Sequence, residues 1–499
     1  MLKQPRLSRV VFVLATVFFA AGCVTERSPV TGEKQRLAFS WEQEKELGRK
    51  SDQEITTQMG AYDSEDLQAY VDHVAERVLQ ASDFSRTDLP KRYRDTTFTF
   101  RILDNRIVNA FALPGGYVYV TRGLLAHVEN EAQLAVVLGH EIGHVAARHS
   151  AQRALKQQWS QIGLIAGVLV GSQVLGGGAQ DLFQLGGTAM QLLLNSYSRE
   201  NEREADRLGV RYAAAAGYAA AEGAGFFVTL DRKSQAAGAA LPSWQSTHPD
   251  PGEREATIRR LAQEFDTRYE MTTVGTDALM TAIDGLVVGS DPRQGIVLGG
   301  SFLHPVLDFQ FDPPAGWRVQ NQAQAVLMGH PDQQAMLTFE ITPGDTPAAA
   351  AAQLKQEGQL QVVREGDFRI DGLNAYFIEG RANAQDRTLA LMFVFVELDQ
   401  RVYAFSGYTA AAEHDRYIER FAEVARSFGP LQDRAILNAQ PHRLETFRAR
   451  DTRLFSAYVP PKLPPELDAQ TLAIMNQTEI DDATTPGTWL KLPQAQPTR

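Results

Sequence analysis

The 499-residue sequence predicts an α+β chain with more than one domain. Helical apolar periodicity dominates up to about residue 270. Within this region, two predicted strands flank the LPGG turn at 113–116 and indicate a small β-sheet. From about residue 291, alternating β-forming residues indicate a second α+β domain. The expected division is a leader at 1–23, a polar tether at 24–40, a mostly helical domain at 41–270, a linker at 271–290, an α+β domain at 291–430 and a small C-terminal segment at 441–499.

The charge balance argues against one class of function. The chain carries 60 acidic and 49 basic side chains, which gives a formal net charge of -11. Proteins that bind nucleic acid need a basic surplus to neutralise phosphates. We therefore expect no nucleic-acid partner.

The N-terminal segment has the pattern of an export signal. Three basic residues precede an apolar run from Val10 to Ala21, and small residues then lead to Cys23, the only cysteine. The "AAGC" stretch resembles the lipobox of bacterial lipoproteins, although Ala20 stands where leucine is usual, and this resemblance implies a lipid anchor on Cys23. The residue that follows, Val24, favours the outer membrane over retention in the inner membrane. The alternative is a plain signal peptide with an incidental cysteine.

Three of the 10 histidines lie in the stretch "VVLGHEIGHVAARHS". His140 and His144 are four residues apart, so on a helix both imidazoles project from one face and can reach one metal ion. Glu141 lies one position round the helix, where it can act as a general base beside that ion. His149 falls outside the ligand spacing, which predicts a surface position or one behind the ligands. The alternative is a buried helix whose histidines are satisfied by hydrogen bonds.

The helix that carries these residues has recognisable limits. Asn130 is a good N-cap with Gln133 three residues later, and the pattern predicts a helix from Glu131 to about Arg153. Gly139 and Gly143 lower its helix propensity by about 1 kcal/mol each. We infer that they remove side chains so that a neighbouring element can approach closely.

A catalytic zinc needs a third protein ligand. A predicted helix at about Ala189–Ala216 carries Glu202 and, one turn later, Asp206, which can orient a ligand histidine through its second ring nitrogen. Glu200 is the rival ligand, but its partner one turn later is the longer Glu204. The alternative for all four is a solvated charged helix face.

The "HEIGH" and "YSRENEREAD" motifs resemble the HtpX, CAAX-prenyl-endopeptidase and Oma-like family of gluzincin zinc metallopeptidases. The upstream "NAFALPGGYVYVTRGLL" and "SPVTGEKQ" stretches narrow the resemblance to BepA-like and LoiP-like periplasmic lipoproteins, over about residues 26–265. It implies a zincin-type metalloprotease domain with one Zn²⁺, whose site residues are the ligands His140, His144 and Glu202, the base Glu141 and the orienting Asp206.

The same resemblance implies further roles. Val118–Thr121 is expected to be a strand along the edge of the cleft, where a substrate backbone could add. In "STHPDPGER", His248 is expected to approach the zinc as a fourth ligand and keep the enzyme latent. The implied substrates are misfolded or misassembled envelope proteins, and the implied location is the periplasmic side of the outer membrane.

Other regions are less specific. The apolar stretch Ile162–Gln180 is broken by glycines, which favours a helical hairpin or flap over a membrane span. No helical repeat of about 34 residues follows, and instead residues 291–430 resemble a Mog/PsbP-like domain. Thr471–Pro493 faintly resembles half of a glycan-binding LysM module, so peptidoglycan is a further expected partner.

Three hypotheses follow for the whole chain. The first is a zinc endopeptidase of the cell envelope. The second is a largely latent protease that acts as a chaperone-like assembly factor, and the third is a catalytically silent lipoprotein that binds glycan or protein. The intact motif at His140, Glu141 and His144 favours the first.

Overall fold

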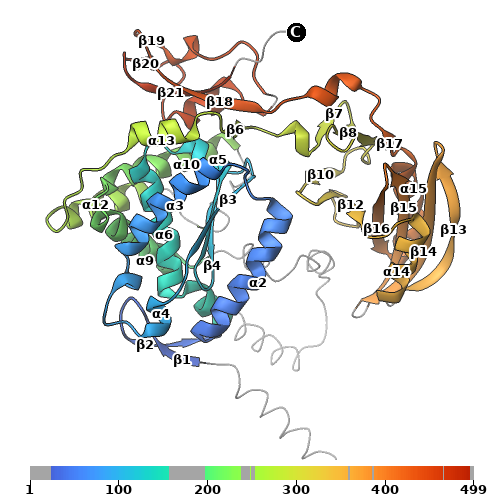
Figure 1. Ribbon diagram of the computed structural model, residues 1–499, viewed down its shortest axis with the longest axis horizontal. Helices are drawn as coiled ribbons and strands as arrows, with labels where there is room; N and C mark the ends of the chain where they lie inside the picture. Colours follow the sequence, from blue (N-terminus) through green and yellow to red (C-terminus); the bar gives the residue numbers. More distant parts are fainter. Residues whose placement is uncertain are drawn as a thin grey trace, which may run out of the picture.

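The structure, a computed structural model, describes residues 24–156, 197–237, 248, 253–357, 360–384, 387–464 and 466–494. The predicted lipid anchor at Cys23 and the apolar stretch Ile162–Gln180 lie outside these residues. Among the helices described, none combines the length and apolar character that a membrane crossing requires. The chain mixes helices and sheets as predicted, in a helical body and a β-rich body (Figure 1).

The helical body surrounds a three-stranded sheet of order β3–β5–β4. Helix α3 shows why its elements form. Ser64 caps its N-terminus, and Leu67, Val71, Val74 and Val78 recur at helical spacing on its buried face. The elements of this body are β3 (Thr99–Leu103), β4 (Ala110–Leu113), β5 (Tyr117–Thr121), α2 (Trp41–Met59), α3 (Glu65–Gln80), α4 (Lys91–Arg94), α5 (Arg122–His127), α6 (Glu131–Ala147), α9 (Arg199–Ala215), α10 (Gly223–Ala237), α12 (Arg254–Asp266) and α13 (Thr276–Ile283).

Strand β5 corrects one expectation. It pairs in parallel with β3 on one side and antiparallel with β4 on the other. Its backbone groups are therefore engaged on both sides, and no edge is left for a substrate to add to Val118–Thr121. The prediction that a substrate backbone could add to this strand was wrong, because the sequence pattern does not reveal which strand is central.

Residues 24–40 are more ordered than the polar tether that the sequence suggests. They form an antiparallel hairpin, β1 (Val24–Arg27) with β2 (Lys34–Leu37). The guanidinium of Arg148 lies 2.5 Å from a Glu26 carboxylate oxygen and 2.5 Å from one of Glu44 on α2. Arg148 is fully buried, so this ion-pair network fixes the hairpin and α2 against the end of α6.

The β-rich body contains a seven-stranded antiparallel sheet of order β10–β11–β12–β16–β15–β14–β13 and a smaller sheet of order β17–β9–β8–β7. Its core residues run from Phe302 to Phe428. The elements are β7 (Ile296–Leu298), β8 (Ser301–His304), β9 (Phe309–Phe311), β10 (Arg318–Asn321), β11 (Ala325–Gly329), β12 (Ala335–Thr342), α14 (Pro347–Glu357), β13 (Gln361–Ile370), β14 (Leu373–Ala384), β15 (Arg387–Leu398), β16 (Arg401–Ala410), α15 (His414–Arg426) and β17 (Gly429–Pro430).

The chain enters and leaves the β-rich body at neighbouring points. It leaves the helical body after β6 (Val287–Val288) and returns in β18 (His442–Arg448), and Val288 pairs with His442. The C-terminal segment then adds β19 (Arg453–Leu454), α16 (Ala469–Met475), β20 (Ala483–Thr484) and β21 (Trp489–Pro493). The β-rich body is thus an insertion between two paired strands.

The C-terminal segment is part of the helical body's core. Its buried apolar residues join that core directly, and they are Leu444, Ala449, Phe455, Leu472, Ala473, Met475, Leu490 and Leu492. Lys491 is fully buried. Its ammonium donates to the carbonyl of Val128 at 2.8 Å and forms an ion pair with Glu129 at 2.8 Å. The segment therefore contacts the residues that immediately precede α6.

Candidate metal centre

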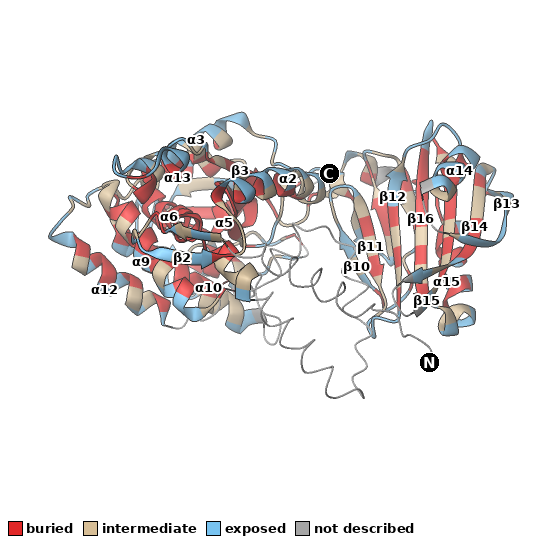
Figure 2. Ribbon diagram, turned by 90° about the horizontal axis from the view of Figure 1, so that it is seen from below, coloured by how far each residue is buried: buried red, intermediate tan, exposed pale blue. Residues whose placement is uncertain are grey.

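Helix α6 lies in the middle of the helical body, and each of its residues is buried (Figure 2). The Asn130 side chain caps it by accepting from the Gln133 backbone N–H at 2.9 Å, as the sequence predicts. The helix ends at Ala147, earlier than predicted, because Arg148 adopts the left-handed conformation with φ 62°. Helical residues resume after that turn.

Helix α9 crosses α6 at a contact between glycines. A Cβ atom added to Gly139 would lie 2.8 Å from the Gly209 carbonyl oxygen, and one added to Gly209 would lie 2.7 Å from the His140 nitrogen. Only glycine on both sides allows this separation. The close approach that the sequence suggested for Gly139 is therefore an approach of α9, and it brings Glu202 to the histidines.

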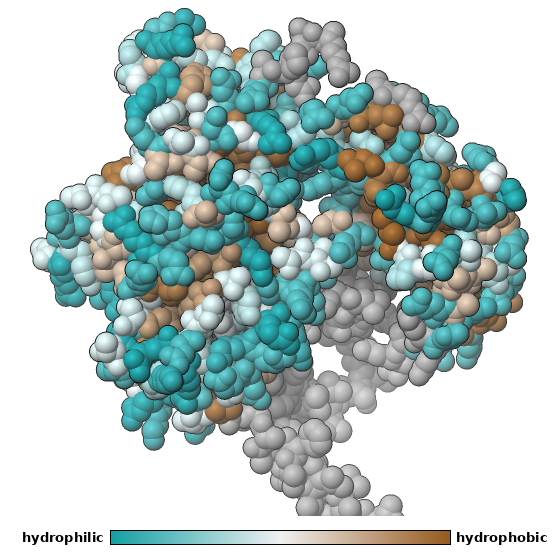
Figure 3. All heavy atoms as spheres, in the orientation of Figure 1, coloured by the Kyte–Doolittle hydropathy of each residue, from teal (hydrophilic) through white to brown (hydrophobic). Residues whose placement is uncertain are grey.

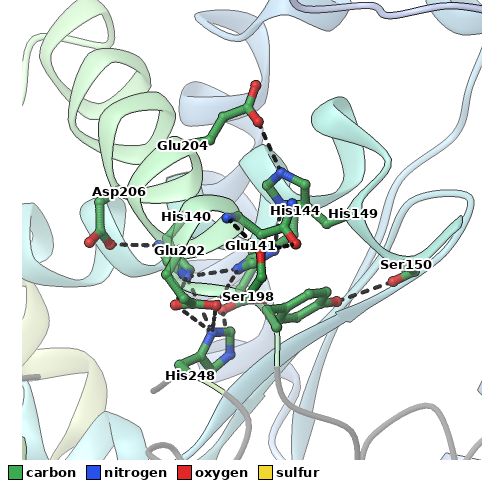
Figure 4. Close-up of polar contacts among 12 residues, drawn as sticks. His140, Glu141, His144, His149, Ser150, Ser198, Glu202, Glu204, Asp206 and His248 are labelled. Atoms are coloured by element: carbon green, nitrogen blue, oxygen red, sulfur yellow. Dashed lines mark hydrogen bonds and ion pairs between the residues drawn. The ribbon is translucent and has the colours of Figure 1, made fainter. Parts of the chain in front are cut away.

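Four buried side chains from three parts of the chain converge: His140, His144, Glu202 and His248 (Figure 4). One ligand atom from each lies within 4.8 Å of all the others. The Nε2 atoms of His140 and His144 are 2.9 Å apart, and Glu202 carboxylate oxygens lie 3.5 and 3.4 Å from them. The Nδ1 atom of His248 lies 3.1 Å from both Glu202 oxygens.

Neighbouring groups orient the two helix histidines. The Nδ1 of His140 lies 3.0 Å from Asp206, and the Nδ1 of His144 lies 2.9 Å from the Nδ1 of His149. His149 in turn contacts Glu204 at 3.2 Å. An Nδ1–H of His140 directed to Asp206 would leave the Nε2 lone pair of that ring available to a metal ion. The Nε2 atoms of His140 and His144 face each other beside the Glu202 carboxylate, and this donor set fits one metal ion.

Glu141 lies beside this cluster with neither carboxylate oxygen hydrogen-bonded within the described part of the chain. It is fully buried, and the Nε2 of His248 lies 3.7 Å from one of its oxygens. Burial raises the pKa of its carboxyl group. A buried carboxylate without a partner is costly, and a substrate or water in the site would supply one.

The pKa values of the two glutamates of the site, Glu141 and Glu202, shift in opposite directions. Burial would raise the pKa of Glu202, but His248, His140 and His144 outweigh it and hold that pKa well below its usual value. Glu202 is therefore an anion, as a metal ligand must be, whereas the pKa of Glu141 moves upward as a proton acceptor requires.

Arg254 is a site residue that the sequence analysis missed. It is buried, its guanidinium donates to Asp206 through Nε at 3.1 Å, and it lies 3.4 Å from Glu202. It holds the carboxylate that orients His140. The arginine ends the "HPDPGER" stretch, so its closeness to His248 in the sequence was the available signal.

The rival acidic residues have other positions. Glu200 is exposed and lies outside the four-residue cluster. Glu204 contacts His149 and not the cluster itself. His149 is fully buried behind His144, which settles the choice left open by the sequence in favour of a position behind the ligands.

Comparisons with known proteins agree with this geometry. Residues 65–262 match Peptidase family M48. A Vibrio cholerae protein of the beta-barrel assembly-enhancing protease type is 33% identical over 204 residues, which cover 40% of this chain and 40% of that protein. The Escherichia coli beta-barrel assembly-enhancing protease is 32% identical over 34% of this chain and 35% of its own length. The bovine mitochondrial metalloendopeptidase OMA1 is 33% identical over 34% of this chain and 33% of its own length.

The family match lies within the helical body. The match spans less than half the length of each of these relatives. Among solved structures, the cyanobacterial PsbP of Synechocystis is 17% identical with a TM-score of 0.23, over 27% of this chain and 95% of that one. Family M48 is zinc-dependent, and the buried His-His-Glu-His cluster suits a single ion. Residues 65–262 are therefore a domain of the M48 metallopeptidase family.

Proposed function

We propose that this chain is a zinc-dependent endopeptidase in which His140, His144 and Glu202 hold the metal and Glu141 is the general base. The observation that carries the proposal is the unpartnered, buried Glu141 carboxylate beside three converging ligand atoms. A purely structural histidine cluster would have no use for an unsatisfied acid at this position.

The chemistry follows from the side chains. Zinc in this site would polarise a peptide carbonyl and acidify the attacking water. Glu141 accepts the proton of that water and passes it to the leaving amine nitrogen. Asp206 holds the Nδ1–H of His140, and Arg254 holds Asp206, so the ligand is oriented before substrate arrives.

His248 supports a latent form of the enzyme. Its Nδ1 lies 3.3 Å from the Nε2 of His140 and 3.1 Å from Glu202, in the place where an open coordination position is needed. We propose that His248 occupies this position at rest and leaves when substrate binds. Replacement by alanine is expected to raise casein cleavage, and His73→Ala, at an exposed histidine, is the control.

The substrate class is proposed from the relatives and the sequence. Two of the relatives are named for assembly of β-barrels, and the N-terminal pattern indicates export. We propose misfolded or misassembled envelope proteins as substrates, at the periplasmic side of the outer membrane and with Cys23 lipidated. The Mog/PsbP-like domain would select partners, and the LysM-like segment would contact peptidoglycan.

The decisive experiment compares the wild type with Glu141→Gln, which keeps the shape and removes the base. Both proteins are expected to hold about one zinc per chain, while casein cleavage falls about 10²–10⁴-fold in the variant. Equal cleavage by both proteins, or a wild type without zinc, would contradict the proposal. If the wild type and His248→Ala both bind zinc but cleave nothing, the chaperone-like hypothesis is favoured.

A further inference from the structure

A cavity of about 370 Å³ opens on the β-rich body, away from the metal centre. It lies between the small sheet and the end of the large one. Its apolar walls come from both sheets, and they include Phe302, Leu307, Phe309, Val326 and Phe339. This volume accommodates a large aliphatic or aromatic side chain.

The mouth of the cavity carries exposed apolar residues. Ile341 lines the cavity and is 47% exposed, and Val306, 67% exposed, adjoins Leu307 in its wall. Val297 on β7 is 53% exposed and pairs with Phe302, so the two side chains share the face of the sheet that borders the cavity. Apolar surface also gathers on this side of the β-rich body in Figure 3. Such a patch around a hollow marks a binding surface.

Strand β7 is an unprotected edge. It ends the order of its sheet and pairs only with β8 among the described strands. Edge strands are usually protected by charge, yet the central residue of Ile296–Leu298 is an exposed valine. Its free backbone groups could pair with an extended peptide.

The lining of the cavity carries little charge. The described side chains around the cavity include neither lysine nor arginine, and Glu340 is the only carboxylate. Burial raises the pKa of Glu340 and lowers that of His304 to about 4, so the histidine is neutral at pH 7. The remaining polar groups are mainly amides. The side chains of Gln294 and Asn321 already donate within the protein, whereas those of Gln322 and Gln324 can bond to a peptide backbone.

The cavity adjoins the helical body. Ala323 on its rim donates to the carbonyl of Gln58, the penultimate residue of α2, at 3.1 Å. Gln294, also on the rim, donates to Asp104 in the loop after β3 at 2.5 Å. A polypeptide seated here would therefore lie next to the domain that carries the metal centre.

We propose that this cavity is an exosite that takes a large apolar side chain from an extended, unfolded protein substrate. The inference rests on the proposed peptidase function and deepens it, since folded proteins bury the side chains that the exosite selects. The free edge of β7 and the rim amides favour a peptide over a lipid chain, because a lipid chain has no backbone groups for them to bond.

The test uses the full chain with Ile341→Asp and Val297→Asp, both at exposed positions. The control is Val363→Asp, at a 60% exposed valine on β13, the opposite edge of the large sheet. Cleavage of unfolded casein is compared with cleavage of an eight-residue fluorogenic peptide. The double variant is expected to raise KM for casein at least fivefold, with kcat and cleavage of the short peptide unchanged. The control variant is expected to match the wild type in all three quantities. A KM for casein within twofold of the wild type would overturn the inference.

A binding measurement separates this inference from the proposed function. With Glu141→Gln as background, fluorescein-labelled casein is titrated in an anisotropy assay, which needs no catalysis. The two aspartates are expected to raise Kd at least fivefold, and an unchanged Kd would overturn the inference even if the enzyme is active. Saturable palmitate binding that the aspartates abolish, with casein binding intact, would also overturn it by showing an acyl-chain site.

Discussion

The two bodies of the molecule build their cores in opposite ways. The core of the helical body draws on residues from Trp41 to Leu492, so it needs both ends of the described chain. The core of the β-rich body uses one continuous stretch, from Phe302 to Phe428. The helical body that holds the metal centre therefore includes a segment far beyond the metal-binding motif in the sequence, and the four residues of the cluster all lie before the large domain.

The largest effect is expected from ending the chain after residue 440. This removes six large buried side chains from the helical core, each worth about 1.5–3 kcal/mol of burial, and the sum rivals the usual stability of a domain. We expect the shortened protein to lose its folded helical domain and its zinc, as measured by circular dichroism and metal analysis. A chain ended after residue 494 is the control, and normal zinc content after the longer truncation would contradict the shared core.

A smaller loss is expected from Lys491→Met. The change removes the ammonium that contacts Glu129 and the Val128 carbonyl, and leaves a largely buried carboxylate without its partner. We expect the free energy of unfolding of the helical domain to fall by about 3 kcal/mol. Denaturant unfolding measures the loss, and Lys462→Met, at an exposed lysine, should be neutral. Equal stability of the two variants would show that the contact is not needed.

The β-rich body offers a pH-dependent test. The pKa of His304 is lowered by burial to about 4 from its usual 6.5, so the folded state favours the neutral ring. The neutral His304 ring therefore contributes fully to the free energy of unfolding above about pH 6.5, and this contribution is lost as the pH falls towards 4. His304→Asn keeps an acceptor for the Leu307 N–H but cannot titrate in this range. Between pH 7 and 4 the wild type should lose about 2 kcal/mol more unfolding free energy than the variant, and parallel pH profiles would refute this.

The smallest effect is expected from deleting the entire β-rich body. Val288 and His442 are paired antiparallel neighbours, so replacing residues 289–441 by Asn-Gly closes them with a two-residue hairpin turn. We expect normal zinc content and unchanged cleavage of an eight-residue peptide, with weaker cleavage of unfolded casein. Loss of zinc in a folded deletion protein would show that the bodies are not separable.

The sequence predicted the local part of the site well. His140 and His144 are spaced by one turn of α6, and Glu202 and Asp206 are spaced by one turn of α9. Helix geometry alone therefore predicts that the two members of each pair lie on the same face of their helix. Even the close approach at Gly139 could be inferred, because a helix interior rarely accepts glycine without a packing reason.

Long-range packing could not be predicted in the same way. Nothing local marks β5 as the central strand, or the C-terminal segment as part of the first core. The role of Arg254 could not be predicted from local sequence either. Its partner Asp206 lies 48 residues earlier, and the two residues pair only when α9 and α12 pack together. Such contacts depend on the complete fold, whereas motif spacing depends only on one helix.

Arg148 has a mechanical consequence. One guanidinium at the end of the metal-binding helix holds Glu26 of the first hairpin and Glu44 of α2. Tension applied to the chain ahead of Val24 would pass through the hairpin and this ion pair into the last turn of α6, only four residues from His144. The ligand helix is therefore directly coupled to the first hairpin that the structure describes.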